Sequence, residues 1–280
     1  MNKYKMPLQG ADEYLEHCYS IPKKIPVLPL EDEPFLNRWQ ESAGSNVLEF
    51  MKNSLGLPTP DFKWLKADSL SISFTQTAGG KLPVITTGCH EDFRAMEALV
   101  NGGSHPRELP LSVNAFTIQA RAASIFHHRI ILLNHAPYSN VPAEKLGLSS
   151  EEWLEHSYGL RLAHEGTHYE TLRLLSGMKN HALDEICADA IGQIAAFGNF
   201  DADRQRLFFG LERGKNTCTG RLSFYCQKVD EKERCRIYTA VDKILDDVAT
   251  EIQELLYNDT DPFFILMKLA ARSIAERLKG

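Results

Sequence analysis

The chain has 280 residues, of which 43% are hydrophobic and 24% charged, and its net charge is −6. This composition is typical of a folded globular protein and excludes disorder as the main state. The excess of acidic over basic side chains argues against general nucleic-acid binding, which needs a positive field. The most apolar segment, Phe263 to Ala271, contains Lys268 and is too short to span a membrane. We therefore expect neither a nucleic-acid nor a membrane partner.

The beginning of the chain carries two lysines in its first ten residues, but no apolar segment follows them. We therefore expect no signal peptide and a cytoplasmic protein. The six cysteines form no CxxC pair, and reduced thiols are the expectation for a chain of this length.

The first half of the chain is predicted to mix helices and strands. Residues 1–35 contain five prolines, which predict an extended arm that wraps a folded body. The hydrophobic spacing predicts the following elements: a helix over 35–56, a strand over 70–74, a helix over 91–100 and a strand over 127–133. Residues 112–126 fit a strand or a helix, with the helix slightly favoured, and the proline-containing residues 134–147 are predicted to form a loop.

The second half is predicted to be helical. Ser149 and Glu152 form the pattern of a capping box before a helix that runs to about 175, and Gly177 suits its end. Further helices are predicted over 180–197 and 229–257, and a last one begins at Asp261-Pro262. The expected fold is α+β and mostly helical. We expect one domain over 1–280, with the arm 1–35, a mixed part 36–148 and a helical part 149–280.

The helix that follows Ser149 contains the sequence His164-Glu165-Gly166-Thr167-His168, an HExxH motif. Residues four apart share one face of a helix, so both imidazoles can bind one zinc ion, with Glu165 beside them as a general base. A third ligand is available on the next helix, where Glu185 follows His168 by 17 residues. Asp184 is the alternative third ligand, and Asp189 shares the face of Glu185 one turn further on.

At these residues the sequence resembles the zincin metallopeptidases, specifically the thermolysin-like glutamate-zincin branch, and more weakly a group of uncharacterised bacterial proteins. The resemblance covers about 40 residues, from Ser149 to Gly192. It implies a zincin-like fold with a small N-terminal sheet packed on the HExxH helix. It also implies His164, His168 and Glu185 as zinc ligands, Glu165 as the base, and Asp189 as a hydrogen-bond partner of a ligand histidine. A strand beside the helix would align the substrate, and 127–133 is the candidate.

Each of these residues also has an ordinary structural interpretation. The two histidines are compatible with a hydrophobic core, and Arg161 is spaced to pair with Glu165 on the helix surface. Asp184, Glu185 and Asp189 are also suited to the start of a helix, where acidic residues are favoured. Gly166 points away from the histidines and predicts a close backbone approach behind the helix.

Residues that stabilise the transition state are less clearly marked. Four candidates come from the helices and loops that follow the motif: Arg221, Tyr225, Tyr238 and His181. The sequence does not choose among them.

We therefore expect a zinc-dependent hydrolase, most simply a peptidase acting on a peptide or small amide. The alternatives are a non-enzymatic helical interaction protein, with or without a structural metal, and, less favoured, a di-iron carboxylate protein based on the ExxH pattern. The geometric test is whether the helices 150–176 and 180–197 pack antiparallel with Glu185 facing the histidines. A Glu185 that pairs with lysine or arginine would count against that assignment.

Overall fold

A computed structural model describes residues 9–42, 45–58, 60–177 and 179–280. The protein is α+β, and about half of it is helical. Its backbone divides into two compact units. We call residues 24–174 the sheet unit, and residues 1–23 with 175–280 the helical unit. The HExxH helix therefore belongs with the sheet, whereas the sequence had grouped it with the C-terminal helices.

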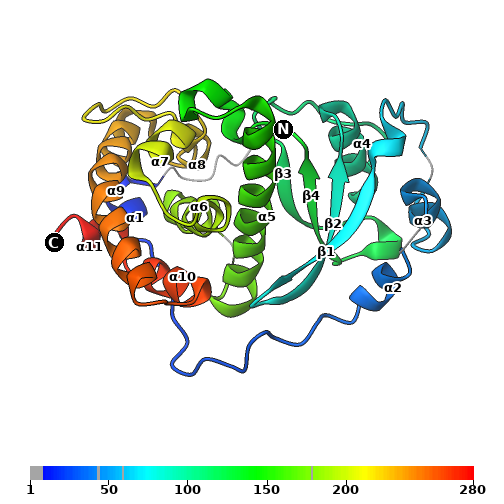
Figure 1. Ribbon diagram of the computed structural model, residues 1–280, viewed down its shortest axis with the longest axis horizontal. Coiled ribbons are helices and arrows are strands. Elements are labelled where there is room, and N and C mark those ends of the chain that lie inside the picture. The colour runs from blue at the N-terminus through cyan, green and yellow to red at the C-terminus, as the bar shows by residue number, and fades with distance from the viewer. Residues whose placement is uncertain (1–8, 43–44, 59, 178) are drawn as a thin grey trace, which may run out of the picture. The chain divides into compact units, whose positions relative to one another are not determined.

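The sheet unit is built on four strands in the order β1-β2-β4-β3 (Figure 1). β1 pairs antiparallel with β2, β2 parallel with β4, and β3 antiparallel with β4. The strand bounds are β1 Ser71–Thr77, β2 Gly80–Thr87, β3 Ala115–Gln119 and β4 Arg129–Asn134. The helix bounds are α2 Leu36–Gln40, α3 Val47–Asn53, α4 His90–Val100 and α5 Ser150–Leu174, with short 3-10 turns at Ala67–Ser69, Ala123–Ile125, Tyr138–Asn140 and Ala143–Leu146.

Each face of the sheet carries its own hydrophobic core. On one face, Phe93 and Met96 of α4 pack with Trp39, Phe50 and the side chains of alternate strand residues. On the other face, α5 covers a smaller cluster that contains Val84, Ile131 and Tyr169. Figure 1 shows α5 and α4 on opposite sides of the strands. The motif helix is thus held by the sheet that its own unit provides.

α5 packs closely against β1 at Gly166. A Cβ atom at this position would lie 3.2 Å from Cγ2 of Thr77 on β1. A close neighbour therefore lies behind the motif, as expected, but it is a side-chain methyl group and not backbone.

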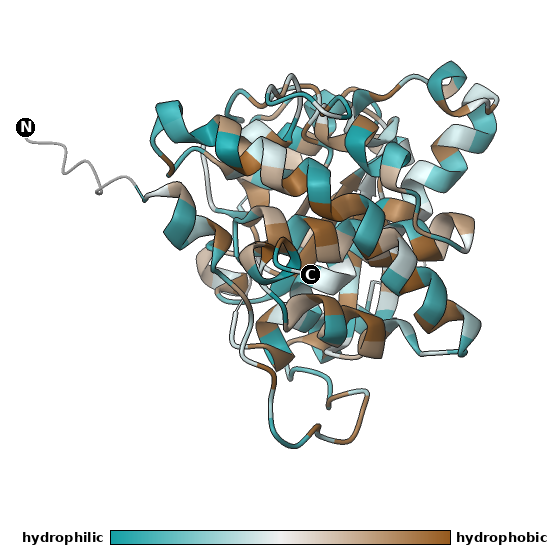
Figure 2. Cartoon of the chain, turned by 90° about the vertical axis from the view of Figure 1, so that its left-hand side faces the viewer, coloured by the Kyte–Doolittle hydropathy of each residue, from teal (hydrophilic) through white to brown (hydrophobic). Residues whose placement is uncertain are grey.

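The helical unit contains α1 and the helices that follow the motif. Their bounds are α1 Ala11–Leu15, α6 Ala182–Phe197, α7 Ala202–Phe209, α8 Leu222–Tyr225, α9 Arg234–Tyr257, α10 Pro262–Ala270 and α11 Ile274–Arg277, with a 3-10 turn at Glu231–Glu233. The predicted apolar stripe of α9 is buried along its length, from Ile237 to Leu255. Hydrophobic and hydrophilic residues alternate around the helices that face the viewer in Figure 2. None of the described helices is long and apolar enough to cross a bilayer.

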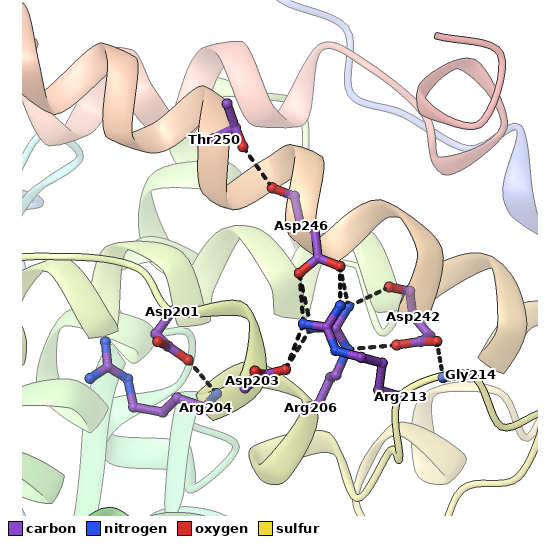
Figure 3. A network of polar contacts seen from close by, with 9 residues as sticks. All are labelled: Asp201, Asp203, Arg204, Arg206, Arg213, Gly214, Asp242, Asp246 and Thr250. Carbon is purple, nitrogen blue, oxygen red and sulfur yellow. Dashed lines mark hydrogen bonds and ion pairs between the residues drawn. The ribbon is translucent and has the colours of Figure 1, made fainter.

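A charged network joins α7 to α9 in this unit. The buried side chain of Arg206 contacts Asp242 at 2.6 Å, Asp246 at 2.9 Å and Asp203 at 2.9 Å. Arg213 lies on the outer side of the network and contacts Asp246 and Asp203 (Figure 3). Every charge in this group therefore has a partner of opposite sign.

Several predicted elements are correct. The structure confirms α4, β1, β4 and α5, and Ser149 and Glu152 exchange the two hydrogen bonds of a capping box. It also confirms α6, α9 and α10, with Gly198 in the left-handed conformation after α6 and Asp261 capping α10.

Other predictions are wrong. The predicted helix 35–56 is two helices, because the Asn46 side chain caps a new helix at Val47. Its residues 43–44, like the first eight residues of the arm, lie outside the described residues. Residues 115–119 form a strand instead of the favoured helix, since Phe116 and Ile118 alternate into the core on the α4 face.

The predicted strand 127–133 corresponds to β4, which is not an edge strand of the sheet. β4 lies between β2 and β3, and β3 forms the edge instead. A continuous apolar run such as Ile130 to Leu133, buried on both faces, is typical of a central strand.

Candidate functional site

The two motif histidines face each other across one turn of α5. Nε2 of His164 lies 3.0 Å from Nε2 of His168, and both rings are buried. Two nitrogens at 2.0–2.1 Å from a tetrahedral zinc ion are separated by about 3.3 Å. The pair therefore presents its Nε2 atoms in nearly the arrangement that one ion requires.

Tyr138 orients His164. Its hydroxyl lies 3.1 Å from Nδ1 of His164. If Nε2 is the ligand atom, the ring proton is on Nδ1 and is donated to the tyrosine oxygen, which fixes the tautomer. Sequence reasoning missed this residue, because a lone tyrosine in a loop carries no recognisable pattern.

The loop that carries Tyr138 is fastened to α5. The backbone N–H of Tyr138 donates to Ser157 at 2.9 Å, and the indole of Trp153 donates to Val141 at 2.6 Å. Arg161 donates to the carbonyls of Ala136 and Pro137, and its guanidinium lies over the ring of Tyr138. Arg161 is thus used to hold the loop beside the motif.

Glu165 is joined to the edge strand of the sheet. The hydroxyl of Thr117 on β3 lies 2.8 Å from Oε2 of Glu165 and 2.7 Å from its carbonyl oxygen. A neutral hydroxyl fixes the direction of a carboxylate without neutralising its charge. Thr117 could not be identified from the sequence, since its contact with Glu165 depends on how β3 lies under α5.

The helical unit holds the proposed third ligand. Glu185 is buried in the first turn of α6, and its Oε2 lies 3.2 Å from Nη1 of Arg221. This ion pair between Glu185 and Arg221 counts against Glu185 as a metal ligand. However, a carboxylate has two oxygens and accepts about four hydrogen bonds, so the contact of Arg221 with Oε2 does not by itself exclude a role as a metal ligand. That Glu185 faces the histidines stays a prediction.

The two neighbouring acids have firm partners inside the same unit. Asp184 accepts a hydrogen bond from the hydroxyl of Tyr19. Asp189 accepts one from Gln205 at 2.5 Å and forms an ion pair with Arg221. Arg221 therefore bridges Glu185 and Asp189 across one turn of α6. A contact of Asp189 with a ligand histidine also stays a prediction.

The four candidates for transition-state stabilisation have different surroundings. Arg221 contacts Glu185, and Tyr225 is close to the same carboxylate. Burial and the negative charge of Glu185 raise the pKa of the Tyr225 hydroxyl well above its usual range. Tyr238 lies on α9, where burial and the neighbouring Cys226 raise its pKa to about 12.

His181 caps the N-terminus of α6. Its Nδ1 accepts a hydrogen bond from the backbone of Leu183, which caps α6, and its Nε2 lies 2.8 Å from the carbonyl of Tyr14. Burial lowers the pKa of His181 to about 4, so the ring is neutral at pH 7. Both ring nitrogens are used, which leaves neither for a substrate.

Comparison with known proteins gives a family but no activity. Residues 119–274 match the model of a family of unknown function, DUF7005. This range contains His164, Glu165, His168 and Glu185, and begins two residues after Thr117. No curated protein matches the chain, and no solved structure matches it. Because the match covers more than half of the 280-residue chain, the chain belongs to the DUF7005 family.

Proposed function

We propose that this protein is a zinc-dependent hydrolase that acts on peptides or small amides. The paired Nε2 atoms of His164 and His168, 3.0 Å apart on one face of α5, are the observation that carries the proposal. Two further features support it. Glu165 lies between the histidines in the chain, and Tyr138 and Thr117 hold His164 and Glu165 in fixed directions.

Glu185 is the third protein ligand in this proposal. Its position 17 residues after His168 and its place in the first turn of α6 support the assignment. Arg221, which contacts both Glu185 and Asp189, would keep the carboxylate ionised and fixed in direction. A zinc ion bound by these residues supplies a Lewis acid and lowers the pKa of a bound water.

The protein groups then carry out the proton transfers. Glu165 accepts a proton from the attacking water and later delivers it to the leaving amine. Thr117 keeps the Glu165 carboxylate turned toward the sheet edge, where the substrate backbone would lie. Arg221 and Tyr225 are the candidates for stabilising the negative charge that develops on the carbonyl oxygen, and Tyr238 is a weaker one.

The edge of β3 is suited to align an extended substrate. Asn114 and Ala120 form their hydrogen bonds toward β4, so Ala115, Thr117 and Gln119 direct their N–H and C=O groups outward. Within the described residues no strand pairs with that outer edge. A peptide added there as a strand would pass Thr117, and with it Glu165.

Metal analysis of the purified full chain tests the proposal. The protein should retain about one zinc ion per chain after dialysis, and His164→Ala or His168→Ala should lose it, because two remaining ligands hold the ion poorly. His135→Ala, at an exposed histidine, is the matched control. Unchanged zinc in both motif variants would place the metal elsewhere.

The third ligand is tested separately. Glu185→Gln should weaken zinc binding, whereas Asp184→Asn should leave it nearly unchanged, because Asp184 is hydrogen-bonded to Tyr19. The opposite pattern would transfer the ligand role to Asp184. Competition with a fluorescent chelator measures both affinities.

A further inference from the structure

A cavity of about 730 Å³ runs along the β3 edge of the sheet unit. Its wall is formed by the consecutive residues 116–121, by the end of α4, and by the loops that carry Arg107 and His127. Thr117, which contacts Glu165, is part of this wall. The cavity therefore adjoins the position where the proposed substrate would lie.

The charged groups of the wall are mostly basic. Four of its five titratable side chains are cationic types: His105, Arg107, Arg121 and His127. The fifth, Glu97, is already paired with Arg107 at 2.9 Å and hydrogen-bonded by Asn101. With histidines counted as neutral, the wall carries two arginines against one glutamate, whereas the chain as a whole has a net charge of −6.

Arg107 is held in place before any ligand arrives. Its guanidinium lies 5.7 Å from the centre of the Phe116 ring, and Arg94 donates to its backbone carbonyl at 2.7 Å. Its side chain nevertheless remains 60% exposed, so its outer donors face solvent. A fixed guanidinium fork binds a carboxylate with little loss of side-chain entropy.

Arg121 is the second cation at the wall. Its backbone N–H donates to Val100 at 3.2 Å, which fixes its position at the end of the cavity. Its side chain is exposed, and no carboxylate among the described residues lies within ion-pair distance of it. An acidic ligand would supply the partner that this arginine lacks among the described residues.

We propose that this cavity binds an acidic extended peptide, with carboxylate side chains paired to Arg107 and Arg121. In a strand, every second side chain points to the same side, so alternate acidic residues would face the cavity. One part of the inference rests on the proposed function: that the bound peptide is the substrate of the hydrolase. Binding by the cavity does not require the metal or Glu165.

Fluorescence anisotropy with labelled peptides tests the proposal. The full chain carrying Glu165→Gln, in buffer with a chelator, is titrated with fluorescein-labelled (Glu-Ala)₃, (Gln-Ala)₃ and (Lys-Ala)₃. The glutamate peptide should bind at least about tenfold more tightly than the other two, because each carboxylate gains a charge-assisted hydrogen bond. Raising the salt concentration should weaken it, as expected for exposed pairs.

Variants locate the site. Arg107→Glu with Arg121→Glu should weaken binding of (Glu-Ala)₃ by about tenfold or more. Because Arg107 also contacts Glu97 and Phe116, the single variant Arg121→Gln is the milder test, with an expected loss of about threefold. Lys52→Glu, at an exposed lysine on α3 outside the cavity, is the matched control and should change the affinity less than twofold.

The outcomes separate the two proposals. Equal binding of all three peptides, or no effect of Arg121→Gln, overturns the acidic site. Tighter binding of a labelled oligothymidylate than of (Glu-Ala)₃ overturns the peptide class. If the zinc-loaded parent binds (Glu-Ala)₃ through the arginines but does not cleave it, the cavity assignment stands and the hydrolase proposal fails.

Discussion

The two units both bury ionisable side chains, but they surround them differently. In the helical unit, the buried Arg206 contacts three carboxylates (Figure 3). The more exposed Arg213 contacts two of the same carboxylates. In the sheet unit, the motif groups contact each other and the neutral hydroxyls of Tyr138 and Thr117. Removing one member of a buried charge network leaves a buried charge without its partner, whereas a neutral hydroxyl fixes the direction of a carboxylate or an imidazole without neutralising it.

For the sheet unit, the largest expected effect is the loss of hydrolysis when the proposed base, Glu165, is replaced. Glu165→Gln should lower hydrolysis by about 10²–10⁴-fold, because an amide cannot accept the proton of the water, while zinc content stays the same. Glu155→Gln, at an exposed glutamate on the same helix, is the control. Equal activity of Glu165→Gln and the parent would remove Glu165 from the mechanism. The assay needs a cleavable peptide, and (Glu-Ala)₃ with a fluorescent reporter is the first choice.

Removing the centre of the charge network gives the largest expected effect on stability. Arg206→Leu should lower the free energy of unfolding by about 3–5 kcal/mol, because Asp242 is left buried without its cation. Arg213→Leu is the matched control: this side chain contacts the same Asp246 but is 56% exposed, so its loss should cost at most about 1 kcal/mol. Urea unfolding measures both. Equal costs would show that burial does not distinguish the two arginines.

The cap of α5 contributes a smaller amount. Ser149→Ala should lower the free energy of unfolding by about 1 kcal/mol, since the N–H of Glu152 loses its acceptor. Ser150→Ala, one residue further on and exposed, should change it by less than about 0.5 kcal/mol. If both changes are neutral, the capping box does not contribute to the position of the motif helix.

The smallest effect concerns pH. Hydrogen bonds from Arg213 and Arg206 lower the pKa of Asp246 from 3.8 to about 2. Its contribution to stability is therefore present above pH 4 and is lost as the pH falls through about 2. Asp246→Asn should flatten the acid side of the stability profile, and the variant should converge with the parent at the lowest pH. A profile parallel to that of the parent would contradict the assigned pKa.

The sequence by itself determined the long helices and the residues of the motif. HExxH depends only on helical periodicity, and the cap of α5 and the buried stripe of α9 depend only on local spacing. These signals are local, so they could be read without knowing what packs against them. The same holds for Gly166, whose lack of a side chain indicated a close neighbour before Thr77 was known to be that neighbour.

Only the tertiary structure decided β2, β3 and the partners of the motif. β2 was not predicted because Gly80 and Pro83 break its pattern, yet pairing with β1 and β4 on both sides holds it in the sheet. β3 has five residues, too few to separate a strand from a helix by periodicity. Thr117 and Tyr138 reach Glu165 and His164 from distant parts of the chain, and such contacts are set by packing, which leaves no local pattern in a sequence.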